Sequence, residues 1–315
     1  MAWVCKKCST NNVDGDCSCI VCGEVRPKDI LSDSILSSMG SVSESLTSAI
    51  SARKSVAAEK EYAEAKELLK TDPKAGYTKM RACALGGHAR AQNEVGDCYY
   101  YGKGVEQDYL KAISWYEKAA AQGLAQAQYN IGFCYSRACG VERDYAKAFA
   151  WFSKAKDNGH VTAQHEIGVC YYYGRGVELD YYAAYACFKK SADSGYARSQ
   201  NEVGDCYFYG HGVTQDYAKA IPWYQKATEQ GLTSVQYNLG FCYSRGKGVS
   251  QDYTKALELF KKAAESGHVE SQYEMGKCYH YGRGVPIDKS KARTWYSRAA
   301  EKGHTKAKDV LLNDL

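Results

Sequence analysis

One spacing constrains the fold of this sequence more than any other feature: a glycine recurs every 36 residues, six times in succession. A cysteine follows each glycine two residues later, and a tyrosine follows each cysteine. A fixed period of about 20 to 50 residues indicates stacked structural units, each burying its apolar face against its neighbours. The sequence therefore predicts a repeat protein. The glycines are Gly96, Gly132, Gly168, Gly204, Gly240 and Gly276, and the cysteines are Cys98, Cys134, Cys170, Cys206, Cys242 and Cys278.

Each unit has the pattern of two short helices joined by a glycine-containing loop. Ala91, Val95 and Cys98 are spaced by four and three residues, which places them on one face of a first helix over about 89–101. The loop Gly-x-Gly-Val ends this helix. Asp108 and its counterparts precede a second helix, where a short carboxylate accepts hydrogen bonds from unpaired backbone N–H groups. The sequence therefore predicts helix pairs with aspartate N-caps.

The repeated glycine and cysteine both fall inside the first helix. Glycine in a helix interior costs roughly 1 kcal/mol relative to alanine, so its recurrence needs a compensating gain, and close approach between helices is the simplest one. The cysteines have two interpretations. A metal or redox site needs several ligands within a few ångströms, whereas successive repeats separate one cysteine from the next. We therefore expect the cysteines to be small apolar residues of the core.

One complete unit has a motif that can be compared with known repeats. It reads Ala-Gln-x-x-x-Gly-x-x-Tyr, then Gly-x-Gly-Val, then Asp-Tyr-x-Lys-Ala-x-x-Trp-Tyr-x-Lys-Ala-Ala-x-x-Gly. This motif resembles that of the Sel-1-like repeat (SLR) family. The resemblance implies an all-α fold, a TPR-like right-handed α-solenoid of 36-residue helix pairs, whose first helices line a concave surface used for protein binding.

The same family contains a remote functional alternative. Some secreted bacterial relatives carry two cysteines per repeat that form disulfides, and β-lactam binding is associated with them, so the resemblance also allows a β-lactam-binding enzyme. Only one cysteine recurs in each unit of this sequence. The hypothesis of a β-lactam-binding enzyme therefore loses its main support.

Ahead of the repeats stand two Cys-x2-Cys pairs. Four thiolates are the number that tetrahedral Zn²⁺ takes in a closed structural site. About 20 residues cannot build a hydrophobic core, so metal binding must supply the folding energy of such a segment. With Trp3 and Asn12, the spacing resembles the Ran-binding-protein-2-type zinc finger, which implies one structural Zn²⁺ ion. The four cysteines are Cys5, Cys8, Cys19 and Cys22.

Fingers of this family divide into ubiquitin binders and single-stranded RNA binders. The ubiquitin class has Thr-Phe after the second cysteine and an apolar residue between the last two cysteines, and here only Val21 matches. The RNA class uses paired arginines and a stacking aromatic side chain, whereas residues 13–16 are acidic and lack aromatics. The ligand-binding candidates are Trp3, Asn12 and Val21. Ubiquitin or another protein is the expected ligand, single-stranded RNA is the alternative, and a purely structural finger remains open.

The array is expected to have atypical ends. The first unit lacks the Gly-x-Gly-Val loop, and after Gly303 a further first helix begins without completing a unit, as in a terminal cap. The Ser-rich segment before the array spaces Ile35, Met39, Val42 and Leu46 by four and three residues, which indicates either a linker that packs on the first repeat or a short amphipathic helix. The expected organisation is a zinc finger at 1–28, a linker at 29–56 and a repeat array at 57–315, with a divergent repeat at 57–88, six regular repeats at 89–303 and a cap at 304–315.

A second, longer period points to a binding surface. Residues 93–137 match residues 201–245 at 33 of 45 positions, so a block of three repeats has been duplicated. A stripe at spacing four beside the apolar face carries Tyr, Phe and Arg, which are favoured at interface hot spots. By analogy with the family, the stripe lines a groove that binds a protein or peptide; the alternative is that Phe133 and Phe241 are buried between units. The groove candidates are Tyr101, Tyr129, Phe133, Arg137, Tyr173, Tyr209, Tyr237, Phe241, Arg245 and Tyr281.

Composition narrows the function further. The net charge of +5 is too weak and too dispersed to indicate a nucleic-acid binder, and the seven histidines form no set suited to catalysis. No stretch of about 18 apolar residues and no apolar leader is present, and the cysteine pattern suits a reducing compartment. We therefore expect a non-enzymatic adaptor or scaffold of the cytoplasm or nucleus that binds proteins.

Overall fold

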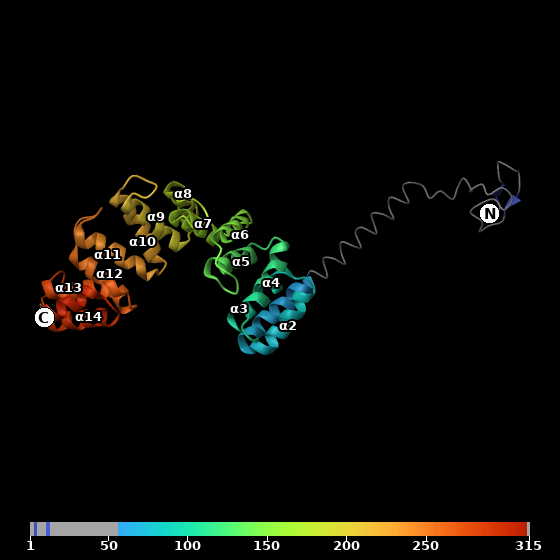
Figure 1. The fold of residues 1–315 in the computed structure, drawn as a ribbon, viewed down its shortest axis with the longest axis horizontal. Coiled ribbons are helices and arrows are strands. Elements are labelled where there is room, and N and C mark those ends of the chain that lie inside the picture. The colour runs from blue at the N-terminus through green and yellow to red at the C-terminus, as the bar shows by residue number, and fades with distance from the viewer. Residues whose placement is uncertain (1–2, 5–10, 13–55, 314–315) are drawn as a thin grey trace. The chain divides into compact units, whose positions relative to one another are not determined.

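The computed structural model describes residues 3–4, 11–12 and 56–313 (Figure 1). The chain divides into two units, Met1–Glu67 and Leu68–Leu315. Among the described residues, no helix is both long and apolar enough to cross a lipid bilayer.

The first unit contains one short pair of strands. Strand β1 (Trp3–Val4) pairs antiparallel with strand β2 (Asn11–Asn12). Residues 56–71, which span the boundary of the unit, are helical. The rest of the predicted zinc finger and nearly all of the predicted linker lie outside the described residues.

The second unit is helical throughout its described residues, and its first and second helices alternate along the array. Every helix from α2 to α14 has 13 residues, and α15 has nine. The helices are α2 (Pro73–Leu85), α3 (Ala89–Tyr101), α4 (Tyr109–Ala121), α5 (Ala125–Arg137), α6 (Tyr145–Asp157), α7 (Val161–Tyr173), α8 (Tyr181–Asp193), α9 (Ala197–Tyr209), α10 (Tyr217–Glu229), α11 (Thr233–Arg245), α12 (Tyr253–Glu265), α13 (Val269–Tyr281), α14 (Lys289–Glu301) and α15 (Thr305–Asn313).

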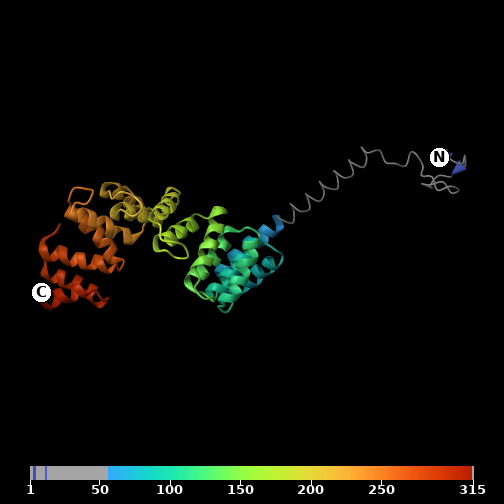
Figure 2. The same ribbon diagram turned by 45° about the horizontal axis from the view of Figure 1, so that its top comes forward.

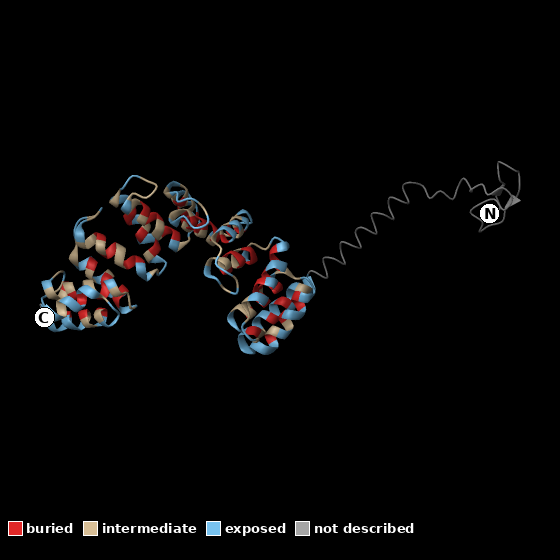
Figure 3. Cartoon of the chain, in the orientation of Figure 1, coloured by how far each residue is buried: buried red, intermediate tan, exposed pale blue. Residues whose placement is uncertain are grey.

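These helices stack in chain order. Each packs mainly against the helix before it and the helix after it, and Figure 2 shows the same succession from a second direction. Most helices carry a buried face and an exposed face (Figure 3), and the buried residues form a series of similar clusters along the unit. The predicted all-α repeat solenoid is therefore confirmed.

The predicted N-caps occupy their expected positions. In α4 the carboxylate of Asp108 accepts a hydrogen bond from the backbone N–H of Lys111 at 2.9 Å. The second helix of every regular repeat begins with an equivalent bond. Because such bonds favour the ionised carboxylate, the pKa of Asp108 is lowered.

Each glycine in the interior of a first helix makes room for an aromatic ring of the second helix. A Cβ atom added at Gly168 would lie 2.6 Å from two ring carbons of Phe188, and one at Gly96 would lie 2.4 Å from the ring of Tyr116. The predicted close approach is confirmed, and it joins the glycine of the first helix to a side chain of the second. The six rings belong to Tyr116, Phe152, Phe188, Tyr224, Phe260 and Tyr296, all of which are buried.

The repeated cysteines are buried free thiols. Burial raises the pKa of Cys98 to about 12 and that of Cys278 to about 11. A protonated, buried thiol packs as a small apolar group. The prediction that these cysteines belong to the core is therefore confirmed.

One helix end departs from the repeat pattern in a way that can be tested. Ala138 caps α5 with a φ of 59°, whereas glycine holds the equivalent position in the other regular repeats, including Gly246. A left-handed conformation costs a residue with a Cβ roughly 1–2 kcal/mol. We expect Ala138→Gly to raise the free energy of unfolding by about 1 kcal/mol, and Gly246→Ala to lower it by a similar amount. Urea denaturation of the two variants measures both changes, and changes of the same sign would contradict the assignment.

Candidate functional site: two equivalent pockets along the first helices

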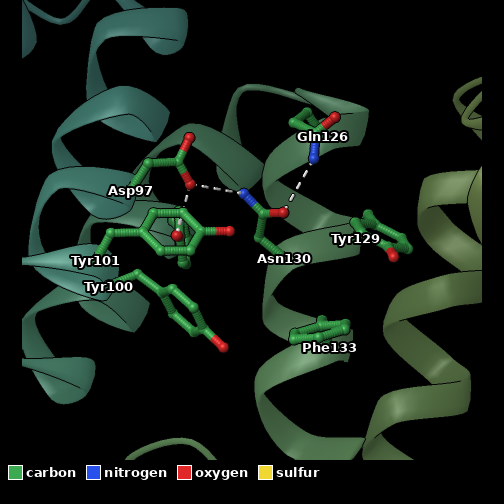
Figure 4. A pocket seen from close by; sticks show the side chains of 8 residues that line it. Asp97, Tyr100, Tyr101, Gln126, Tyr129, Asn130 and Phe133 are labelled. Carbon is green, nitrogen blue, oxygen red and sulfur yellow. Dashed lines mark hydrogen bonds between the residues drawn. The ribbon is translucent and has the colours of Figure 1, made fainter. Parts of the chain in front are cut away.

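A pocket of about 230 Å³ is lined by α3 and α5, with one residue from α4 between them (Figure 4). Three aromatic side chains at exposed or half-buried positions, Tyr101, Tyr129 and Phe133, line it together with the polar side chains of Asp97 and Asn130. All three aromatic residues were predicted from the sequence as groove candidates. The full lining is Asp97, Tyr100, Tyr101, Tyr116, Gln126, Tyr129, Asn130 and Phe133.

A second pocket of about 220 Å³ is lined by the corresponding helices three repeats later, α9, α10 and α11. Each of its lining residues lies 108 positions after a lining residue of the first pocket. The main difference is polarity, because Phe208 replaces Tyr100 and Ser234 stands at the position of Gln126. The lining is Phe208, Tyr209, Tyr224, Tyr237, Asn238 and Phe241. We refer to the two together as the paired pockets.

A hydrogen-bond network at the first pocket joins three helices. Oδ1 of Asp97 accepts hydrogen bonds from the hydroxyl of Tyr116 at 2.7 Å and from Nδ2 of Asn130 at 3.3 Å. Oδ2 of Asp97 accepts another from Nδ2 of Asn93 at 3.1 Å. Gln126 donates to Oδ1 of Asn130 at 2.9 Å, as Figure 4 shows. The network links the first repeat to the second and fixes the carboxylate beside the pocket.

The second pocket has the same network. Asp205 accepts hydrogen bonds from the hydroxyl of Tyr224 at 2.6 Å, from Nδ2 of Asn201 at 3.0 Å and from Nδ2 of Asn238 at 3.3 Å. Nδ2 of Asn238 also donates to Oδ1 of Asn201 at 3.2 Å. The duplication has therefore preserved a three-dimensional arrangement as well as a sequence.

Sequence reasoning missed this network, although a signal for it was present. Aspartate stands one residue after the helix-interior glycine only in the first and fourth regular repeats, and both repeats carry tyrosine as the buried ring residue. The second, third and fifth repeats combine a phenylalanine ring with an apolar residue at the aspartate position. The sixth pairs Tyr296 with Lys277, and the buried hydroxyl of Tyr296 has no hydrogen-bond partner among the described residues. This co-occurrence of Asp and Tyr predicts the contact.

The carboxyl groups beside the second pocket titrate close to neutral pH. Burial raises the pKa of Asp205 to about 6. Burial and then the nearby charge of Asp205 raise the pKa of Glu202, one helical turn earlier, to about 7. The surface around the second pocket therefore becomes more negative as pH rises through this range.

The other groove candidates lie outside the paired pockets. Tyr173 and Tyr281 are exposed at the ends of their helices and line neither pocket. Arg137 and Arg245 are also exposed, and each places its guanidinium carbon near the phenylalanine one turn before it, 5.5 Å from the ring centroid of Phe133 in the first case and 5.7 Å from that of Phe241 in the second. The arginines thus stand beside the pockets on the same helices.

A larger polar cavity adjoins the second pocket. It measures about 600 Å³ and shares Tyr237 and Phe241 with that pocket. Arg245 lines it together with Glu274 and Lys277 of α13, whose side chains form an ion pair at 2.7 Å. The hollowed surface therefore continues from one repeat to the next along the first helices.

No group of three or more His, Cys, Asp or Glu side chains in the described part of the chain is arranged to hold a metal ion. Burial keeps the repeated cysteines protonated, and a thiol is a much weaker nucleophile than a thiolate. The arrangement is suited to binding, with aromatic surfaces beside fixed polar groups.

The predicted zinc ligands Cys5, Cys8, Cys19 and Cys22 lie outside the described residues, as does Val21. Trp3 and Asn12 belong to β1 and β2 and are opposite each other in the strand register. The strands are joined by the residues that carry the first Cys-x2-Cys pair. The metal site and its ligand-binding candidates stay predictions.

Comparison with known proteins identifies the repeat. A model of the Sel1 repeat matches six consecutive segments, 89–124, 125–160, 161–196, 197–232, 233–268 and 269–304. Their boundaries follow the 36-residue period found in the sequence.

Two solved structures are similar to the chain. A protective antigen of uropathogenic Escherichia coli strains, which displays an SLR fold, has 33% sequence identity and a TM-score of 0.73, covering 81% of this chain and 56% of that protein. A Sel1 repeat protein from Oxalobacter formigenes has 29% identity and a TM-score of 0.70, covering 76% of this chain and 96% of that protein. The chain thus spans little more than half of the E. coli protein. No curated protein matched it.

Proposed function

Because the chain belongs to the Sel1 repeat family, we propose that it is a non-enzymatic scaffold that binds a protein or peptide partner along the groove containing the paired pockets. Proteins of this family mediate protein–protein interactions. The observation that carries the proposal is the duplicated site, in which three aromatic lining residues, an aspartate hydrogen-bonded to a lining tyrosine and an adjacent arginine recur 108 residues apart. Packing between repeats does not require an exposed arginine at these positions.

The groove has the composition of a binding surface. Tyr101 and Tyr209 are 73% and 59% exposed, so the pockets open beside large aromatic surfaces. Tyrosine and arginine are enriched at binding hot spots because they combine a large contact area with a polar group. Affinity capture with the intact chain, compared with a variant in which Arg137 and Arg245 are both replaced by alanine, tests the proposal.

The N-terminal segment is proposed to act as a second binding module. We infer that residues 1–28 form a Ran-binding-protein-2-type finger around one structural Zn²⁺, held by Cys5, Cys8, Cys19 and Cys22. Four thiolates suit tetrahedral zinc, and β1 pairs with β2 on either side of the first Cys-x2-Cys in the sequence. A reducing compartment, the cytoplasm or the nucleus, suits four cysteines that hold a metal and the free thiols of the repeats.

Purified intact protein is expected to carry one zinc ion per chain, and Cys5→Ser is expected to lose it because three thiolates leave the site incomplete. Elemental analysis measures the zinc. Circular dichroism should show an unchanged helix content in Cys5→Ser, since the helices of the repeats do not depend on the metal. Cys17→Ser is the matched control and should retain zinc, because Cys17 falls outside both Cys-x2-Cys pairs. Metal-free wild-type protein, or collapse of helicity in Cys5→Ser, would contradict the two-module account.

Ubiquitin is the first candidate for the finger, with weak affinity expected. Only Val21 matches the ubiquitin-binding pattern, so we expect dissociation constants in the high micromolar range or weaker, about 5 kcal/mol of binding free energy. An NMR titration of labelled ubiquitin with the zinc-loaded intact chain measures this. Submicromolar binding that is lost in Val21→Asp would show that the expectation is wrong. Single-stranded RNA is the alternative ligand, and an oligonucleotide titration decides between the two.

A further inference from the structure

We propose that the polar cavity beside the second pocket binds the side-chain carboxylate of an aspartate or glutamate in a protein partner, while a neighbouring apolar side chain of that partner enters the pocket itself. The inference rests on the proposed groove function and specifies the chemistry of its ligand. It is carried by two cations of the cavity that have no counter-charge, by the wall that the cavity shares with the pocket, and by the recurrence of the same charges 108 residues earlier.

Two basic side chains of the polar cavity take no part in its ion pairs. Arg245 is the last residue of α11, and Lys306 lies in the first turn of α15. Both are exposed, and neither is a member of an ion pair among residues 56–313. Arg245 lies 5.7 Å from the ring centroid of Phe241, a contact that orients its guanidinium group without removing its charge. The cavity therefore presents two positive charges that an acidic side chain can neutralise.

The carboxylates of the cavity already have partners. Glu274 accepts hydrogen bonds from Nζ of Lys277 at 2.7 and 2.9 Å, in an ion pair whose side chains are largely buried. Glu270 lies 2.8 Å from Nε2 of His304. Because Nδ1 of His304 accepts a hydrogen bond from the backbone N–H of Ala307, the ring proton is on Nε2 and is donated to Glu270. Neither carboxylate is therefore bonded to the two free cations.

The balance of charge favours one carboxylate over a polyanion. Three basic and two acidic side chains line the cavity, so an excess of one positive charge remains when His304 is neutral. A single aspartate or glutamate side chain neutralises this excess. A chain of phosphates would bring further negative charges close to Glu270 and Glu274, and like charges at short distance oppose binding. The cavity is therefore suited to an acidic side chain of a protein.

The second pocket supplies the apolar half of the site. It adjoins the polar cavity through Tyr237 and Phe241, which line both. Apart from Asn238, only aromatic residues line the pocket, and apolar groups gain free energy by leaving water for such a surface. Asp205 and Glu202 belong to α9, whereas the cavity lies along α11, α13 and α15. The acidic residue of the partner is therefore expected on the α13 side of its apolar residue, away from the carboxyl groups of α9.

The charges of the cavity recur in the first copy of the duplicated block. Arg137, Glu166 and Arg198 correspond to Arg245, Glu274 and Lys306. Burial raises the pKa of Glu166, and the nearby charges of Arg137 and Arg198 oppose this rise, so the three groups lie close together. Each aromatic pocket is thus followed by two cations around one glutamate. One partner with two acidic and apolar motifs can engage both copies, which raises the overall affinity above that of either site.

Peptide titrations of the intact chain, followed by NMR of the ¹⁵N-labelled peptide, test the inference. The probes are Gly/Ser peptides in which spacers of increasing length separate one leucine from one glutamate, glutamine or lysine. A further probe combines alanine with glutamate. Wild-type protein is expected to bind the best leucine–glutamate probe at least about fivefold more tightly than its glutamine counterpart, which has the same shape without the charge. The preference should decrease at high salt, and the alanine probe should bind more weakly than the leucine probe.

Three variants locate the charge selection. Lys306→Gln and Arg245→Gln should each lower the affinity for the leucine–glutamate probe towards that for the glutamine probe, because each removes one of the two free cations. Lys308→Gln is the matched control, since Lys308 is an exposed residue of the same helix and does not line the cavity. It should keep the full preference for glutamate. Thermal melts show that each variant is folded.

Each of several outcomes would overturn the inference. Equal affinity for the glutamate and glutamine probes, or the same loss in Lys308→Gln as in Lys306→Gln, would show that the cavity does not select charge, which leaves the scaffold function standing. Tighter binding of the lysine probe would assign the opposite charge, and tighter binding of a single-stranded oligonucleotide would assign the cavity to phosphate. No binding of any probe would refute recognition of acidic segments. Failure of the scaffold function would appear separately, as an affinity capture that does not change when the groove arginines are removed.

Discussion

Gly168→Ala is expected to lower the free energy of unfolding by about 2 kcal/mol, although alanine is the better helix former. The cause is the ring of Phe188, because the new Cβ would lie 2.6 Å from its Cδ1 and Cε1 atoms. The ring is buried, so it cannot turn away without disturbing its neighbours. Denaturation by urea, followed by circular dichroism, measures the loss.

The same substitution should change sign when the ring is removed. Phe188→Ala alone is expected to cost about 3–5 kcal/mol. In that background Gly168→Ala should be neutral or stabilise by up to about 1 kcal/mol, because only the helix propensity remains. Gly195→Ala is the control: its φ is +89° and nothing lies within 4 Å of an added Cβ, so it should destabilise in both backgrounds. An equal cost of Gly168→Ala with and without the ring would contradict the packing described here.

The repeat itself could be predicted from the sequence because its signals are local and are repeated. Asp108 marks a helix start through a hydrogen bond to a residue three positions away, and Gly96 marks a close approach because no other residue type fits beneath a ring. Six copies of each signal fix the period, the helix ends and the core face. The structure adds the identity of the ring that each glycine faces, which follows from how the two helices pack.

The binding site was predictable only in part. The aromatic stripe that contains Tyr129 and Phe133 was visible as a spacing of four residues on one helix. The network around Asp97 was not, because it combines residues from three helices, and within its own helix Tyr116 has the spacing of an ordinary core residue. The grouping of the stripe into two pockets, with Tyr173 and Tyr281 outside them, depends on the positions of helices relative to one another.

The double variant Arg137→Ala, Arg245→Ala is expected to lose most of its partner binding while keeping its stability. Both side chains are exposed, and exposed substitutions usually change the free energy of unfolding by less than about 0.5 kcal/mol. A hot-spot arginine contributes on the order of 2 kcal/mol, which corresponds to about a thirtyfold change in affinity at each site. If one partner engages both pockets, each single variant also removes the gain from bivalent binding. The double variant should therefore lose more binding affinity than either single variant.

A second pair of arginines provides a control with the same change in net charge. Arg143 and Arg293 are exposed and line neither pocket. Replacing both with alanine should leave partner binding unchanged. Loss of binding in this control would mean that the overall charge of the array, and not the groove, determines capture.

The most direct test of the groove is quantitative affinity capture with the intact wild type, the groove double variant and the control double variant, with a thermal melt of each protein. The account predicts that at least one partner is recovered with the wild type and the control but is lost with the groove variant, while all three proteins melt at nearly the same temperature. A groove variant that captures the same partners in the same amounts, with an unchanged melt, would contradict binding through the paired pockets. A large decrease in its melting temperature would instead show that the two arginines stabilise the fold.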